Sequence, residues 1–182
     1  MHHSDSSRQS VGVRDMRIRF ETSIPNIELI IDLRKLEKEL INALKHTVSI
    51  IKDDYKRTVR TWSRQPMFVR RGPKKIFGRL EETVSTESEI YFYIDDGTSP
   101  HIIRPRQAGL LSFRTGYRAK TRVGVVGSRA GGAFGPRVSA KQVMHPGFPA
   151  RNFTKTIAKR RQKNLVSLVR LAFNRSFRFG GM

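Results

Sequence analysis

The sequence contains no cysteine, which excludes disulfide bridges, thiolate catalysis and cysteine-based zinc sites. It also has no run of about 18 apolar residues, so a membrane-spanning helix is not expected. The N-terminal stretch MHHSDSSRQS lacks the apolar segment of a secretory signal. With 182 residues, the chain has room for one domain with a substantial core and is too short for two comfortable ones.

Acidic residues are missing from the second half of the chain. All 15 Asp and Glu residues lie at or before Asp96, whereas residues 97–182 hold 18 of the 36 Lys and Arg residues. The formal charge is +21, and most of it belongs to this second half. A basic face that is simply solvated is one explanation. The segregation favours another, a folded surface that faces nucleic acid or a different polyanion, because such an excess repels itself otherwise.

The first third of the sequence predicts an arm, a strand and a long helix. Residues 1–15 are polar and are expected to form a flexible arm, ahead of a single α+β domain over residues 16–182. Alternating apolar residues from Met16 to Phe20 indicate a strand. Asp32 is a plausible N-cap for a helix whose apolar seam runs from Leu33 to Trp62. We expect this helix to lie along one face of a sheet.

The middle of the sequence changes to short apolar runs separated by Gly, Pro and Ser, which predicts four or five strands of a mainly antiparallel sheet. The candidates are Met67–Arg70, Ile76–Val84, Glu89–Ile94, His101–Arg104, Leu110–Phe113 and a further strand near Gln142–Met144. In Glu89–Ile94 the alternation of Ile and Phe with Tyr indicates a central strand covered on both faces. The run from Gly124 to Arg137, GVVGSRAGGAFGPR, is expected to be a projecting loop.

A second helix is predicted from Asn152, its candidate cap, to Asn174. Its apolar seam is interrupted at Arg160 and Arg161, whose side chains are expected to reach solvent or phosphate. This helix holds the densest basic cluster of the chain, and the glycine-rich loop adds two further arginines. The candidate DNA-facing residues are therefore Lys155, Lys159, Arg160, Arg161, Lys163, Arg129 and Arg137.

Motifs for catalysis or cofactor binding are not evident. A phosphate-binding loop needs Gly-Lys-Ser/Thr after its first glycine and four further residues, but Gly127 and Gly132 are followed by Ala133. Asp95, Asp96, His101 and His145 could ligate a metal ion, but their spacing matches no known motif, and Asp-Asp-Gly favours a turn. Ser99 and Ser112 lie in no nucleophile elbow. We expect no catalytic residue, metal or cofactor; a small metal-dependent nuclease is the enzymatic alternative.

Three segments resemble a known family when they are considered together. They are YIDDGTSPHIIRP from Tyr93 to Pro105, LLSF from Leu110 to Phe113, and VMHPGFPARNF from Val143 to Phe153. A Gly-Thr-x-Pro-His turn, an apolar strand and a His-Pro-Gly turn before a C-terminal helix resemble the neck or tail-completion proteins of long-tailed bacteriophages. The order of long helix, strand-rich middle and second helix is also similar, over roughly residues 30–178.

This resemblance implies a structural virion protein of the neck, assembled in the host cytoplasm. It implies a homo-oligomeric ring of six subunits around the passage for genomic double-stranded DNA, with portal-side connector or stopper proteins on one side and tail terminator or tail tube proteins on the other. The DNA contacts would go to phosphates, and the glycine-rich loop would reach the lumen or a neighbouring ring. The residues that would form turns or subunit contacts are Gly97, Thr98, His101, His145, Pro146 and Gly147.

A second class of protein also fits the charge. A non-viral basic protein could bind nucleic acid through phosphates, without sequence specificity. Such a protein would act as a monomer or dimer, so ring formation distinguishes the two classes.

Overall fold

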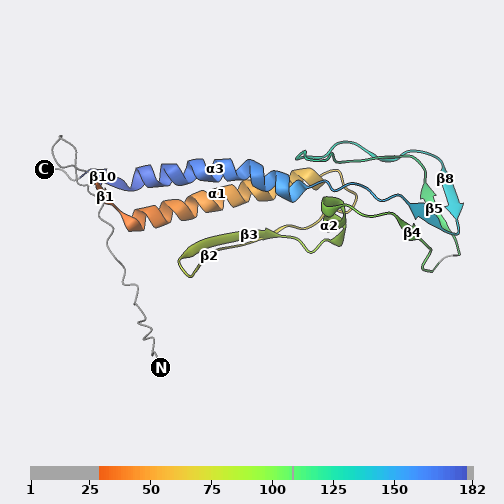
Figure 1. Cartoon of the computed structure of the whole chain (residues 1–182), viewed down its shortest axis with the longest axis horizontal. Coiled ribbons are helices and arrows are strands. Elements are labelled where there is room, and N and C mark those ends of the chain that lie inside the picture. Colours follow the sequence, from red (N-terminus) through yellow and green to blue (C-terminus); the bar gives the residue numbers. More distant parts are fainter. Residues whose placement is uncertain (1–28, 108, 180–182) are drawn as a thin grey trace, which may run out of the picture.

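The structure is a computed structural model that describes residues 29–107 and 109–179 (Figure 1). The fold class is α+β, as predicted, with a long N-terminal helix, a C-terminal helix and short antiparallel strands. The predicted arm of residues 1–15 and the strand at Met16–Phe20 lie outside the described residues. The three helices are α1 (Leu33–Val59), α2 (Glu89–Asp96) and α3 (Phe153–Ser176). The strands are β1 (Leu29–Ile31), β2 (Val69–Ile76), β3 (Arg79–Ser85), β4 (His101–Ile103), β5 (Leu111–Arg114), β6 (Tyr117–Arg118), β7 (Gly132–Ala133), β8 (Arg137–Ala140), β9 (Val143–His145) and β10 (Phe177–Phe179).

Helix α1 forms as its sequence predicts and ends slightly earlier. The Asp32 carboxylate accepts a hydrogen bond from Lys35 N at 3.0 Å, which satisfies one of the unpaired amides of the first turn. The helix ends at Val59, and Trp62 lies in the turn that follows. The expectation that α1 lies along one face of a sheet is wrong. Its partner along most of its length is α3, because both helices turn their apolar stripes toward each other, and the β2–β3 hairpin covers another side (Figure 1).

The core lies where α1, α2, α3 and the hairpin meet. Val59, Phe68, Tyr91 and Phe153 are buried together, and Trp62 is among the residues packed against them. The rings of Tyr55 and Phe68 stack with centroids 5.1 Å apart, and Tyr91 meets Phe68 edge to face at 5.5 Å. We refer to residues 29–96 and 151–179, which contain this core, as the helical half, and to residues 97–150 as the β extension.

The predicted central strand at Glu89–Ile94 is wrong, because this segment is helix α2. Ser88 caps the helix by accepting a hydrogen bond from Tyr91 N, and Glu89 stands in the first turn, where a negative charge favours the helix. The two buried residues, Tyr91 and Asp95, are four positions apart and share one helical face. The two buried residues therefore have the spacing of a helix, although Ile and Phe alternate with Tyr along the segment.

The strands pair only in twos, so the predicted single sheet is also wrong. The described residues contain five separate antiparallel pairs: β1 with β10, β2 with β3, β4 with β9, β5 with β8, and β6 with β7. The predicted strand Ile76–Val84 is interrupted by a two-residue turn at Phe77 and Gly78. The strands predicted at His101–Arg104, Leu110–Phe113 and Gln142–Met144 are confirmed to within one or two residues.

The glycine-rich segment does not project from the molecule, which corrects the predicted loop from Gly124 to Arg137. Residues 115–136 form a narrow two-stranded arm that runs from the β5–β8 pair back to the end of α1 (Figure 1). Its tip is tied to the last turn of α1. Gly127 N donates to Thr58 Oγ1 at 3.2 Å, and Ser128 Oγ donates to the carbonyl of Arg57 at 3.1 Å. The end of a helix offers unpaired carbonyls, and these contacts satisfy one of them.

Candidate nucleic-acid interface

The two turns singled out in the sequence lie against each other. Strand β4 pairs with β9 so that His101 is directly opposite His145, and the two rings stack with centroids 5.0 Å apart. Next to them, Thr98 and Phe148 exchange backbone hydrogen bonds of 3.0 and 3.1 Å. Two turns almost 50 residues apart in the sequence thus form one unit, which we call the paired turns (residues 97–101 and 145–149).

Each histidine ring makes a hydrogen bond within its own turn. Gly147 N donates to His145 Nδ1 at 3.0 Å, so the neutral form of this ring carries its proton on Nε2. His101 Nδ1 is 2.9 Å from the carbonyl of Ser99 and must donate to it, which assigns the opposite tautomer. Each ring therefore holds the backbone of its own turn.

Glycine is required where the turns touch. Gly97 and Gly147 have φ values of +80° and +72°, a conformation that other residues seldom adopt. A Cβ atom at Gly147 would lie 2.2 Å from the carbonyl oxygen of Thr98, and one at Gly97 would lie 2.6 Å from Ala150 N. The two turns can approach this closely only because both glycines lack a side chain.

Asp95 joins the paired turns to α3 and does not act as a simple turn residue. Its buried carboxylate accepts hydrogen bonds from the backbone amides of Phe153 and Thr154, the first residues of α3. The predicted cap, Asn152, makes no such bond because its backbone is left-handed, with φ +54°. A carboxylate at this helix end also meets the positive end of the helix dipole. Within the described ranges, no three His, Asp or Glu side chains lie close enough together to share a metal ion.

Tyr91 extends this junction through its hydroxyl group. Its hydroxyl lies 3.1 Å from Thr154 Oγ1, within hydrogen-bonding distance. Burial raises the pKa of Tyr91 far above its ordinary value, and burial also raises the pKa of Tyr55. Both hydroxyls therefore stay protonated at neutral pH, and both rings serve in packing.

The basic cluster on α3 divides into a surface row and a buried ion pair. Lys155, Lys159 and Lys163 are exposed and four residues apart, so they follow one side of the helix over about 12 Å, with Arg160 exposed next to them. Arg161, by contrast, binds Asp54 of α1 through two hydrogen bonds, Nε to Oδ2 at 2.6 Å and Nη2 to Oδ1 at 2.9 Å. Arg161 is therefore not free to meet phosphate, which corrects the expectation for this residue.

The Arg161–Asp54 pair links the two long helices. Only 13% of the Arg161 side chain and 2% of that of Asp54 are exposed, and Arg57 binds the same carboxylate. The hydrogen bond to Asp54 raises the pKa of Arg161 above its already high ordinary value. The two-point contact matches the planar guanidinium to the carboxylate and fixes the register of α1 against α3.

The two arginines of the glycine-rich segment are exposed and lie in the arm or at its base. Arg129 bonds across the arm, its Nε donating to the carbonyl of Ala119 at 3.0 Å. Arg137 begins β8 opposite Arg114 of β5, so two cations are neighbours there. Neither residue is on a loop that projects away from the rest of the chain.

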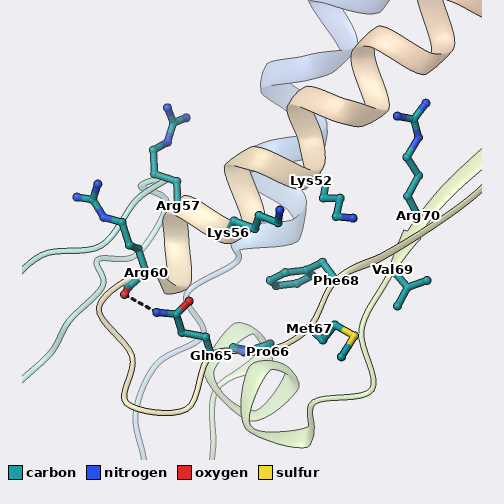
Figure 2. A pocket seen from close by; sticks show the side chains of 10 residues that line it. All are labelled: Lys52, Lys56, Arg57, Arg60, Gln65, Pro66, Met67, Phe68, Val69 and Arg70. Carbon is teal, nitrogen blue, oxygen red and sulfur yellow. Dashed lines mark hydrogen bonds between the residues drawn. The ribbon is translucent and has the colours of Figure 1, made fainter.

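A basic groove that the sequence did not reveal lies between α1 and β2 (Figure 2). It encloses about 790 Å3, and no acidic residue is among those that line it. Figure 2 shows Lys52 and Lys56 above the buried ring of Phe68, with Arg57 and Arg60 to one side and Arg70 to the other. Gln65 closes one end by donating to the carbonyl of Arg60 at 2.8 Å.

Three of the five cations in this groove are available to a ligand. Arg57 is held by Asp54 and Arg70 by Glu82, while Lys52, Lys56 and Arg60 make no ion pair with any residue in the described ranges. The excess of positive charge in the groove is not evident from the sequence, because the neighbouring Asp53 and Asp54 balance Lys52 and Lys56 in a local count of charge. The carboxylate of Asp54 in fact forms ion pairs with Arg57 and Arg161.

Comparisons with known proteins give no relative: no family model, no curated protein and no solved structure matches the chain significantly. The described helices include none that is long and apolar enough to cross a bilayer. The case for a function rests on the geometry and charge described above, together with the resemblance of the two turn motifs.

Proposed function

We propose that the chain is a non-enzymatic structural subunit of the neck of a long-tailed phage virion, forming a ring that joins the portal-side connector to the tail around the DNA passage. The observation that carries this proposal is the contact between the paired turns. In the segments that resemble the neck family, Thr98 bonds to Phe148, and Asp95, just before the first turn, binds the backbone amide of Phe153 at the start of α3. The two motifs therefore form one structural unit, as expected if they belong to a fold that this chain has in common with the neck family.

The charge distribution supports DNA as the neighbour of the ring. Lys155, Lys159 and Lys163 present a row of cations with no acid in their half of the chain. Duplex DNA carries one negative charge per about 1.7 Å of its axis, so a ring with this row toward its lumen would be neutralised by the passing genome. Contacts of this kind go to phosphates and are independent of sequence, as a conduit for a whole genome requires.

Cryo-electron microscopy of virions that contain this chain tests the proposal. We expect density for the chain as a ring between portal and tail, with α3 lysines facing the lumen. Intact particles that lack the chain, or that hold it outside the neck, would contradict the proposal.

The alternative function, a basic protein that binds nucleic acid outside any virion, is favoured by one observation. The groove of Lys52, Lys56 and Arg60 is open in the single chain and needs no second subunit to complete it. Under this alternative the isolated chain binds duplex DNA as a monomer or dimer.

Salt titrations of DNA binding separate the two surfaces. Replacing Lys155, Lys159 and Lys163 by Gln should lower the slope of log K against log salt by about 3 if all three meet phosphate, since each contact contributes about 1. A second variant with Gln at Lys52 and Lys56 and at Arg60 is the matched control for the groove. Under the neck proposal the α3 variant loses more affinity in the assembled ring. Loss confined to the groove variant and seen equally with monomer favours the alternative.

A further inference from the structure

The tip of the β2–β3 hairpin carries an aromatic residue that its own subunit does not use. Ile76 pairs with Arg79, so the turn consists of Phe77 and Gly78, with φ values of +47° and +76°. A turn with two positive φ values favours Asn, Asp or Gly at its first position, and a phenylalanine is strained there. Phe77 is also 100% exposed. Neither turn geometry nor burial within the subunit explains a phenylalanine at this position.

An apolar pocket of about 940 Å3 lies between α2, the two-stranded arm of residues 115–136 and the His-Pro-Gly turn. Its lining includes Trp62, Ile90, Ile94, Tyr117 and Phe148. Several of these walls are open to solvent, since Ile90 is 47% and Tyr117 70% exposed. A pocket of this size and chemistry accepts a large aromatic side chain, the kind of anchor that contributes most at protein interfaces.

Helix α2 and the residues just before it carry acidic side chains, although the charged residues that line the pocket itself are all cations. Among the exposed Asp and Glu residues of the described chain, Glu87, Glu89 and Asp96 gather on or just before α2, beside the lining residues Ile90 and Ile94. The hairpin carries the exposed cations Lys74 and Arg79 next to Phe77. The cations that line the pocket, Arg64, Lys120 and Arg151, come from its other walls. The acidic residues on and just before α2 are therefore opposite in charge to the cations of the hairpin and can pair with them as the apolar tip approaches.

The hairpin cannot reach the pocket of its own subunit. It runs alongside α1, held there by an ion pair between Lys75 and Glu37 at 2.7 Å, and its tip lies at the end away from α2 (Figure 1). The seven residues of β3 span about 23 Å between the tip and the start of the segment that leads to α2. The occupant must come from another molecule, and a second copy of this chain carries the matching tip.

We propose that Phe77 of one subunit inserts into the pocket beside α2 of the next. Tip and pocket are different surfaces, so each copy offers one of each and the contact passes from copy to copy in one direction. A contact of this type closes into a ring when the rotation between copies permits, and otherwise continues as an open filament. This inference rests on the proposed function, because it names the contact that would close the proposed ring.

Photo-cross-linking locates the contact directly. Phe77 is replaced by p-benzoylphenylalanine, the variant is mixed with isotope-labelled wild-type chain, and the mixture is irradiated with and without duplex DNA. The expected result is a cross-link between differently labelled chains at peptides containing Ile90, Tyr117 or Phe148. No inter-chain cross-link under either condition, or cross-links confined to other surfaces, would overturn the inference.

Two variants and a matched control test the direction of assembly. Phe77→Asn keeps the turn favourable and removes the anchor, and Ile90→Lys places a cation on the α2 wall. Phe92→Lys is the control, because Phe92 lies on the same helix with the same 47% exposure but does not line the pocket. We expect the first two to weaken self-association at least tenfold and the control to leave it unchanged. A mixture of Phe77→Asn with Ile90→Lys retains one tip and one pocket, so it should form dimers and nothing larger.

The outcomes separate this inference from the proposed function. If Phe77→Asn chains still assemble into rings in virion necks, the contact is wrong and the neck function stands. If wild-type chains link tip to pocket but form only open filaments and are absent from necks, the contact stands and the neck function fails. Self-association of Ile90→Lys equal to that of wild type overturns the contact in either case.

Discussion

In the helical half the chain buries an aromatic cluster and an ion pair, whereas in the β extension Thr121 is the one buried residue among those described. The β extension instead leaves large apolar side chains at the surface, with Met144 65%, Tyr117 70% and Phe134 71% exposed. Isolated two-stranded pairs are marginally stable in water. The helical half therefore supplies most of the stability of the chain, and the β extension holds its shape through turns and hydrogen bonds.

Exposure of this kind is typical of surfaces that become buried on assembly. The difference between the halves thus predicts which substitutions unfold the protein and which change only its surface. Substitutions in the helical half should lower the global free energy of unfolding. Substitutions in the β extension should act locally, on the hydrogen exchange of its own strands.

The largest expected effect comes from breaking the ion pair between the long helices. Asp54→Ala leaves the guanidinium of Arg161 buried without its partner, which costs about 3–5 kcal/mol of the free energy of unfolding. Denaturation with urea, followed by circular dichroism, measures this. The control is the double variant Asp54→Leu with Arg161→Leu, which should recover most of the stability, because no charge is then buried. Equal losses in both variants would contradict a dominant role for the unpaired charge.

A smaller and local effect is expected at the paired turns. Gly147→Ala combines a positive φ with a Cβ only 2.2 Å from the Thr98 carbonyl, and should cost about 1–3 kcal/mol. Hydrogen exchange of β4 and β9 should accelerate while that of α1 changes little. Gly124→Ala is the matched control, since Gly124 also has a positive φ, +66°, but no atom lies within 4 Å of its added Cβ. The difference between the losses of unfolding free energy in Gly147→Ala and Gly124→Ala measures the cost of the close contact with the Thr98 carbonyl.

Alkaline pH should weaken the helical half through Tyr91. Burial raises the pKa of Tyr91 above the ordinary value of 10.0, so the folded state keeps a proton that the unfolded state releases. This contribution is fully present below about pH 10 and falls as the pH rises through the folded pKa, by up to about 1.4 kcal/mol per pH unit. Unfolding measured from pH 8 to 11 should show the decline, and Tyr91→Phe should flatten it. An unchanged slope in Tyr91→Phe would assign the decline to other groups.

The smallest effect has the opposite sign. Phe77→Asn relieves an unfavourable turn residue whose side chain packs against nothing, so it should raise the free energy of unfolding by about 0.5–1 kcal/mol. The same urea titrations measure this at protein concentrations low enough to keep the chain monomeric. Phe113→Asn, at a strand position of β5, should lower stability instead. Destabilisation by Phe77→Asn would mean that the phenyl ring of Phe77 makes stabilising contacts within its own chain.

The sequence predicted the parts of the fold whose signals are local. The long seam of α1 and the cap at Asp32 lie within one helix, and the strands near His101 and Val143 lie beside strong turn residues. Helix α2 was missed because alternation of Ile90, Phe92 and Ile94 masks the spacing of its two buried residues, Tyr91 and Asp95. The signals that identify it, Ser88 as a cap and Glu89 in the first turn, are also local and were available.

The site could be predicted only in part, because much of it depends on partners distant in sequence. Both turn motifs are visible in the sequence, but only the fold shows that Thr98 bonds to Phe148. Arg161 looked like a phosphate-binding residue because its partner, Asp54, is 107 positions away. The groove of Lys52 and Lys56 was hidden for the same reason, since the carboxylate that seemed to balance the lysines is turned toward α3.

The arm of residues 115–136 is fastened at both ends, and this determines how it would carry a mechanical load. One end continues into the β5–β8 pair, and the tip is bonded to the last turn of α1 through Gly127 and Ser128. Both strands of the arm are continuous with the β5–β8 pair, so a pull along the arm is carried by two covalent backbones in parallel. Force applied to the β extension along the arm would then reach α1, and through Arg161 the second long helix.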